Sequence, residues 1–168
     1  PDMFWSDNGH GQKNRFEPLP LWKKTIDWIA KDYPIVAHNI GFSLGTAGYF
    51  DFEYLENLKK WHEEYAFEWH SDHISYVKLE DEQNFNHNTG MAIPLPFDWE
   101  ILDIISKKIQ LIKNAIDAPF LVENNVYFID ILEQDMNEQT FLNNLCKQSG
   151  CSLILDIHNI YANGRNHK

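Results

Sequence analysis

Short apolar runs alternate with longer amphipathic stretches along most of the chain. Residues 35–37, 69–77, 119–123 and 152–156 are apolar runs bounded by polar or turn residues, which is the pattern of buried strands. The stretches between them place apolar residues three or four positions apart, as on one face of a helix. Strands that alternate with helices at this spacing predict right-handed crossovers and a parallel sheet.

Four helices are predicted, and polar residues mark where three of them begin. Asp51, Asp98 and Asn137 are suited to helix N-termini, because their side-chain oxygens accept hydrogen bonds from unpaired backbone N–H groups. Gly150 ends the last helix in the usual C-terminal position. The predicted helices are residues 19–30, residues 53–65, the apolar stripe from Ile101 to Ile116, and the segment that holds Phe141, Leu142 and Leu145.

Three polar segments are predicted to be irregular. Residues 1–17 are rich in Gly, Asn and Asp and are expected to form a loop. Residues 80–90 are turn-rich, and Pro94 and Pro96 exclude a regular central strand after them. A long excursion of this kind tends to cover a functional site. Residues 163–168 are expected to be a polar tail.

Two α/β architectures, a doubly wound sheet and a TIM barrel, are consistent with this alternation of strands and helices. A doubly wound sheet normally carries a glycine fingerprint for a nucleotide phosphate, and the segment from Gly41 to Gly45 does not match it. A (β/α) TIM barrel has its active site at the carboxyl ends of its strands, and such a barrel takes about 250 residues. We therefore interpret residues 1–168 as a single domain, a partial TIM barrel of about four parallel strands that lacks the first strand and the C-terminal strands.

Composition narrows the function classes. The net charge of -11 argues against general nucleic-acid binding, which needs a basic surface. The two cysteines, Cys146 and Cys151, form no Cys-x-x-Cys motif, so neither a zinc ribbon nor a thioredoxin-type site is indicated. Reduced thiols, together with the lack of a signal peptide or a long apolar run, predict a cytoplasmic protein without a membrane partner.

Residues that bind metals lie at the ends of the apolar runs. His38 follows the first run, His73 lies in the second, Glu123 ends the third, and Asp156 and His158 end the fourth. Because the carboxyl ends of parallel strands meet at one rim, these side chains are expected to converge there. We predict that all five are metal ligands.

Glu123 supports this prediction best, and two assignments stay open. A carboxylate that follows three apolar residues is hard to solvate, and buried carboxylates are paired, hydrogen-bonded or bound to metal. Alternation along the second strand allows either His70 or His73 to point inward, and His73 is nearer the carboxyl end. His158 either binds a metal itself or forms hydrogen bonds to the groups around it.

Imidazole and carboxylate ligands without a thiolate suit iron, manganese or zinc, and several carboxylates favour more than one ion. Asn124 and Asn159 follow two of the strands and can orient the ligands. A divalent-metal TIM-barrel isomerase or hydrolase of the sugar-isomerase or endonuclease kind uses the same residue types, although the acidic charge disfavours the endonuclease form. A metal-free peptide-binding scaffold is a third interpretation.

Four ordered motifs resemble those of the multinuclear non-haem iron-dependent oxidative enzymes, a family long catalogued as a domain of unknown function. The motifs are Ala37-His-Asn-Ile-Gly-Phe-Ser-Leu-Gly45, Ser71-Asp-His-Ile-Ser75, Leu121-Val-Glu-Asn124 and Leu155-Asp-Ile-His-Asn159. The segments Pro94-Leu-Pro96 and Met136-Asn-Glu138 are also similar to this family. The match extends over nearly the whole chain.

This resemblance implies a TIM barrel with two or three iron ions. It implies an enzyme that uses dioxygen to modify a ribosomally made precursor peptide, often at cysteine, with a partner protein that recognises the peptide. It also implies that His38, His73, Glu123 and Asp156 bind iron and that Glu123 bridges two ions, whereas relatives often have Asn at the position of His158. Members of the family are longer, with further ligands in a first strand and a C-terminal half, so this segment alone is expected to be inactive.

Overall fold

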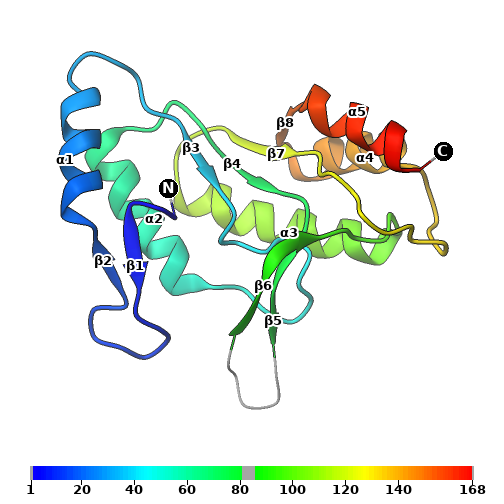
Figure 1. Cartoon of the computed structure of the whole chain (residues 1–168), viewed down its shortest axis with the longest axis horizontal. Helices are drawn as coiled ribbons and strands as arrows, with labels where there is room; N and C mark the ends of the chain where they lie inside the picture. The colour runs from blue at the N-terminus through cyan, green and yellow to red at the C-terminus, as the bar shows by residue number, and fades with distance from the viewer. Residues whose placement is uncertain (1, 81–85, 168) are drawn as a thin grey trace.

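A four-stranded parallel sheet forms the centre of the computed structural model, which describes residues 2–80 and 86–167 (Figure 1). The strands, which lie in the sheet in their chain order, are β3 (Ala37–Asn39), β4 (His70–His73), β7 (Phe120–Glu123) and β8 (Ser152–Ile154). The helices between them are α2 (Phe52–Tyr65), α3 (Trp99–Ala115) and α4 (Glu138–Ser149). The predicted α/β alternation is confirmed. Across the described residues, every helix is too short or too polar to span a lipid bilayer.

The strand register places the predicted ligands on one face of the sheet. His38 pairs with Ser71, and His73 pairs with Glu123. Side chains at paired positions of neighbouring strands project to the same face, and residues two apart along a strand share that face. The residues in between, Asn39, Asp72 and Val122, are at most 1% exposed, as expected for positions that face the helices.

The predicted helix ends are confirmed. The side chains of Asp51, Asp98 and Asn137 each accept a hydrogen bond from the backbone N–H three residues ahead, which satisfies one unpaired donor of the first turn. Gly150 ends α4 with a φ of 67°, a left-handed conformation that glycine adopts without a side-chain clash.

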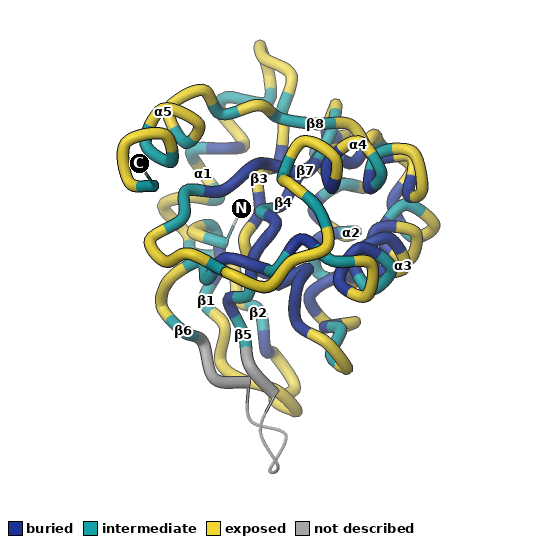
Figure 2. The backbone as a smooth tube through the Cα atoms, turned by 90° about the vertical axis from the view of Figure 1, so that its right-hand side faces the viewer, coloured by how far each residue is buried: buried dark blue, intermediate teal, exposed yellow. Residues whose placement is uncertain are grey.

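Helix α3 contributes the longest buried stripe. Ile105, Ile109 and Ile112 recur at helical spacing, and all three are fully buried. They belong to one apolar core with Phe120 and Val122 of β7, and Figure 2 shows the buried stretches concentrated along the strands and the inner turns of the helices. Burial of each such side chain stabilises the fold by about 1.5–3 kcal/mol. This packing holds β7 in place, and β7 ends at the predicted ligand Glu123.

The prediction of a loop over residues 1–17 is wrong for residues 5–7 and 16–17, whereas residues 8–15 are irregular as predicted. β1 (Trp5–Asp7) and β2 (Phe16–Pro18) form an antiparallel pair, and α1 (Pro20–Ile29) follows as predicted. Trp5 is buried, and its ring packs against the rings of Tyr54 and Trp61 on α2. These long-range aromatic contacts outweigh the turn-rich local composition.

The predicted strand over residues 69–77 is two elements. β4 ends at His73, and the chain continues into β5 (Tyr76–Glu80), which pairs with β6 (Asn86–Ile93) in a hairpin that projects from the body of the molecule (Figure 1). Ser43 Oγ accepts hydrogen bonds from the backbone N–H groups of Val77 and Lys78 at 2.8 and 2.9 Å, which ties β5 to the loop after β3. The predicted irregular segment 80–90 is therefore partly strand, and residues 81–85 lie outside the described residues.

Residues 163–166 of the predicted C-terminal tail are helical, and Lys168 lies outside the described residues. α5 (Ile157–Asn166) begins directly after Asp156, whose carboxylate accepts hydrogen bonds from the backbone N–H groups of His158 and Asn159 at 2.7 and 3.2 Å. The last strand consequently ends at Ile154, two residues earlier than predicted. Asp156 and His158 do not share the face of an extended strand, because one caps a helix and the other lies in its first turn.

Candidate metal centre

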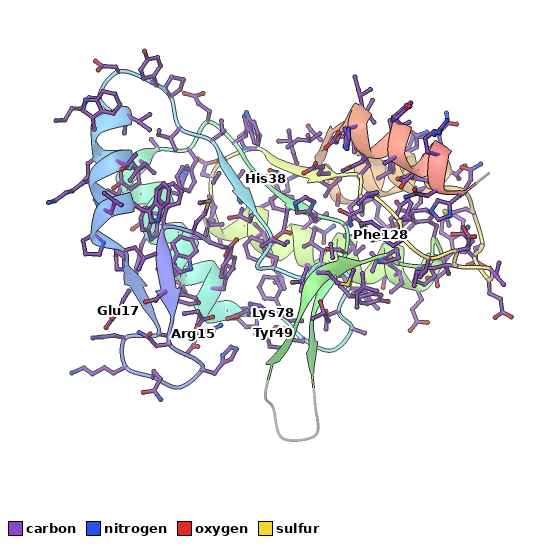
Figure 3. The ribbon with its side chains drawn as sticks, in the orientation of Figure 1. Arg15, Glu17, His38, Tyr49, Lys78 and Phe128 are labelled. Carbon is purple, nitrogen blue, oxygen red and sulfur yellow. The ribbon has the colours of Figure 1, made fainter. Side chains whose placement is uncertain are left out.

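Three side chains converge where β3, β4 and β7 end. Nε2 of His38 lies 3.1 Å from Nε2 of His73 and 2.9 Å from Oε2 of Glu123. Nδ1 of His73 lies 3.5 Å from the same carboxylate oxygen. Two donor atoms that bind one ion through bonds of about 2.1 Å are separated by about 3 Å when the bonds are perpendicular. The spacing of these donors therefore suits a single cation, and Figure 3 labels His38 at the centre of the molecule.

The electrostatics of Glu123 and His38 also suit a cation. Burial raises the pKa of Glu123, and the neighbouring carboxyl of Asp156 raises it further against the opposing effect of His73. Burial and His73 both lower the pKa of His38, which favours the neutral imidazole that metals bind. A bound cation would compensate the carboxylate charge that burial disfavours.

The Nδ1 atom of each imidazole lies within hydrogen-bond distance of a neighbouring side chain. Nδ1 of His38 lies 2.7 Å from Oγ of Ser71, and Nδ1 of His73 lies 3.1 Å from Oδ1 of Asn125. Histidines that bind metals are commonly oriented in this way. Sequence reasoning missed both partners. Alternation along β4, which places Ser71 on the face of His73, was the available signal for one of them.

Asp156 lies beside this group, and His158 is exposed. The carboxyl of Asp156 lies close enough to that of Glu123 to raise its pKa. Asn124 fixes its backbone: Oδ1 accepts from Asp156 N at 2.7 Å and Nδ2 donates to Asp156 O at 3.1 Å. Among the described residues, the mutually close donor atoms at this rim come from His38, His73 and Glu123.

Of the two histidines on β4, His73 is the one that points to the site. His70 is 0% exposed, and its ring packs edge-on against Phe120 at a centroid distance of 5.0 Å. Burial lowers the pKa of His70 to about 4, so the imidazole is neutral. The choice of His73 over His70 agrees with this geometry.

A second group of donors, His10, Asp51 and Glu53, surrounds a buried arginine. Nη1 of Arg15 lies 2.8 Å from a carboxylate oxygen of each acid and 2.9 Å from Nδ1 of His10. Figure 3 labels Arg15 and Lys78, which also contacts Asp51 at 3.4 Å. The two cationic side chains already compensate these carboxylates, so we assign the group as an ion-pair network that fastens the N-terminal hairpin to α2.

Buried polar groups hold the loop that follows His38. Oδ2 of Asp72 accepts a hydrogen bond from Phe42 N at 3.0 Å. Nζ of Lys108 donates to the backbone carbonyls of Ser43, at 3.2 Å, and Thr46. Burial raises the pKa of Asp72 to about 8 and lowers that of Lys108 to about 8. Ser43 has a φ of 49°, a left-handed conformation that these contacts maintain.

Comparisons with known proteins identify the family of this chain. The family described as "RiPP precursor modification enzyme MbnB/TglH/ChrH" matches residues 12–168. A UPF0276 protein of Caulobacter vibrioides is 30% identical over 142 residues, which cover 84% of this chain and 49% of the relative. The corresponding protein of Psychromonas ingrahamii is 29% identical over 156 residues, covering 93% and 53%. The chain spans about half the length of the curated relatives it matches. The match over residues 12–168 shows that the chain belongs to the MbnB/TglH/ChrH family of RiPP precursor modification enzymes.

Proposed function

We propose that this chain is part of a multinuclear non-haem iron enzyme that uses dioxygen to modify a ribosomally made precursor peptide at cysteine. The observation that carries the proposal is the convergence of His38, His73 and Glu123 at one rim of a parallel sheet, in a chain that belongs to a precursor-modifying family. The donor set contains no thiolate, which suits iron.

The proposed ligands fall into two sets. His38, His73 and Glu123 would hold a first ion, because their donor atoms already face one another. Asp156 and His158 are proposed for a further ion, since the Asp156 carboxyl raises the pKa of Glu123 and a pair of neighbouring carboxylates attracts a cation. Bound iron would supply the electrons for dioxygen reduction and a Lewis-acid position for a substrate thiolate.

The remaining residues of the site position these ligands. Ser71 and Asn125 hold the two imidazoles, and Lys108 fixes the loop that follows His38. The His38 side chain is 43% exposed in this part of the protein, which leaves one side of the donor set accessible. A preorganised donor set with an open side is what a metal enzyme needs to bind both its ion and its substrate.

We further propose that the sheet belongs to a single TIM-barrel domain completed by additional strands. Parallel sheets are normally covered on both faces, yet helices α2, α3 and α4 account for one face here. Val36 and Leu155, which flank the edge strands β3 and β8, are 46% and 55% exposed. A partner protein that recognises the peptide, and the activity of the whole enzyme, are parts of the same proposal.

The test is the iron content and the oxygen consumption of the complete enzyme with its precursor peptide. We expect protein purified anaerobically to contain iron and to consume dioxygen as the peptide mass changes. Glu123→Gln, which keeps the size of the side chain and removes its charge, should lose iron and activity together. Complete enzyme purified without iron would contradict the proposal.

The same donor set also suits manganese and zinc, which supports a divalent-metal isomerase or hydrolase as the second candidate. Activity without dioxygen that returns on addition of Mn²⁺ or Zn²⁺ would favour that candidate. A scaffold would be favoured if the protein binds no metal and the Glu123→Gln variant still binds the peptide.

A further inference from the structure

The two imidazoles of the site differ in the group that contacts Nδ1. His38 faces the hydroxyl of Ser71, which either donates or accepts a hydrogen bond. His73 faces the carboxamide of Asn125, whose oxygen only accepts and whose nitrogen only donates. The carboxamide therefore determines which nitrogen of His73 carries the proton, provided that its own orientation is fixed.

The surroundings of Asn125 fix that orientation. Nδ2 of Asn125 lies within hydrogen-bond distance of the backbone carbonyl of Ile74, which can only accept. Asn125 is 4% exposed, and its backbone carbonyl accepts a hydrogen bond from Asn163 Nδ2 at 2.9 Å. A rotation of the amide by half a turn would place an oxygen against the Ile74 carbonyl, so Oδ1 must face His73.

The proton of neutral His73 consequently lies on Nδ1. Oδ1 of Asn125, at 3.1 Å, accepts it, and the nearby Oε2 of Glu123, at 3.5 Å, is an acceptor when ionised. The lone pair is then on Nε2, the atom that points to Nε2 of His38. Two lone pairs would repel at this 3.1 Å separation, and the acceptor Oε2 of Glu123 lies 2.9 Å from Nε2 of His38, so in the ion-free protein His38 carries its proton on Nε2 and Ser71 donates to its Nδ1.

We propose that Asn125 is a positioning residue that locks His73 in the Nδ1–H tautomer, which presents Nε2 to a metal ion, while Ser71 allows His38 to exchange tautomers. When an ion binds, His38 loses its Nε2 proton to solvent and takes one from solvent at Nδ1, so the proton count is unchanged. The Ser71 hydroxyl then accepts instead of donating. The role of the tautomer in metal binding rests on the proposed function, but the tautomer itself does not.

Nitrogen NMR of the ion-free protein, labelled with ¹⁵N-histidine, tests the lock directly. At about pH 8, where imidazoles are neutral, two-bond ¹H–¹⁵N spectra should show His73 with its proton on Nδ1 and His38 with its proton on Nε2. His73→Gln assigns the signal by its loss. Asn125→Leu should abolish the single Nδ1–H form, whereas Asn125→Asp, which loses the hydrogen bond to Ile74 O but keeps an acceptor oxygen beside His73, should retain it. An Nε2–H signal for His73 in the unmodified protein would overturn the inference.

Titration with Co²⁺ or Fe²⁺ then tests its consequence. Asn125→Leu should weaken binding about 10–100-fold, and Asn125→Asp should bind within about tenfold of the unmodified protein or more tightly. Asn144→Leu is the matched control, because its side chain contacts Met136 and not the site. Circular dichroism and the thermal midpoint identify any variant that fails to fold.

The NMR experiment and the metal titration distinguish a failure of this inference from a failure of the proposed function. Equal affinity in the Leu and Asp variants would overturn the positioning role. An unmodified protein that shows the Nδ1–H tautomer but binds no ion would contradict the proposed function and leave the lock confirmed.

Discussion

Glu123 reaches across a strand to His38: its Oε2 lies 2.9 Å from Nε2 of His38, and β4 runs between the strands that carry the two residues. The contact exists because His38 is in register with Ser71 and Leu121, and Glu123, two residues beyond Leu121, projects to the same face of the sheet. The donor cluster therefore depends on the pairing of three strands and not on any one sequence motif.

The first ion should depend on this cluster and not on α5. Glu123→Gln and His38→Ala should each weaken binding of the first Co²⁺ equivalent by more than about 100-fold, because loss of a ligand costs more than loss of a group that orients one. His158→Ala should change it less than about threefold, since His158 is exposed and outside the cluster. Calorimetric titration provides the affinities. A loss in His158→Ala as large as that in His38→Ala would place His158 on the first ion.

Asp156 has two roles that substitutions can separate. Asp156→Asn should keep α5, because Asn caps helices as well as Asp does, but should lower the number of ions bound by removing the carboxylate beside Glu123. Asp156→Ala should also lose about 1 kcal/mol of stability with the cap. Ion stoichiometry and the free energy of unfolding measure the two effects. Equal stability of the Asn and Ala variants would exclude the capping role.

Asp51 should make the fold sensitive to acid. Burial opposes its ionisation, but hydrogen bonds from Arg15 and from Tyr54 N outweigh burial and lower its pKa to about 2. Because the folded pKa lies below the unfolded value of about 3.9, the stabilisation is complete above about pH 4 and is lost as the pH falls through 2.

Asp51→Asn retains the helix cap, so its effect isolates the charge. We expect it to cost about 2 kcal/mol near neutral pH and to flatten the dependence of stability on pH below 4. Asp103→Asn, which removes an exposed pair with Lys107, should cost less than about 0.5 kcal/mol. Urea unfolding over a pH series gives both values, and parallel curves for the Asp51 variant and the unmodified protein would refute the assignment.

The hydroxyl of Ser43 should hold the β5–β6 hairpin to the body of the molecule. Ser43→Ala leaves the N–H groups of Val77 and Lys78 without their acceptor, at a cost of about 1–3 kcal/mol for each donor that remains buried. Amide hydrogen exchange at these two positions should accelerate more than the global change in stability requires. Ser6→Ala, which alters an exposed hydroxyl, is the control. Unchanged exchange at Val77 would show that the hydroxyl does not anchor β5.

Local signals predicted helices α1 to α4 and the rim of the sheet. Asp98 and the isoleucine stripe after it are sufficient to predict α3, because helix capping and helical spacing depend only on residues a few positions apart. The convergence of His38 and Glu123 follows from a general property of parallel strands, whose carboxyl ends share one edge. Neither inference needed knowledge of distant contacts.

The features that the sequence did not reveal depend on contacts between distant segments. β1 forms because Trp5 packs on α2, and β5 leaves the sheet because Ser43 binds its backbone. Asn125 is identified as a partner of His73 only when the loop after β7 is placed beside β4. The start of α5 is the exception. Asp is a usual N-terminal residue of helices, but Asp156 was predicted to be a metal ligand and not to begin a helix.

The graded exposure of the three donors sets an order of arrival for an incoming ion. The side chain of His38 is 43% exposed, that of His73 22% and that of Glu123 10%. An ion that diffuses from solvent meets one imidazole first and the deepest carboxylate last, while the apolar core stays closed. A chelator would then reach the ion from the side of His38, the most exposed of the three donors.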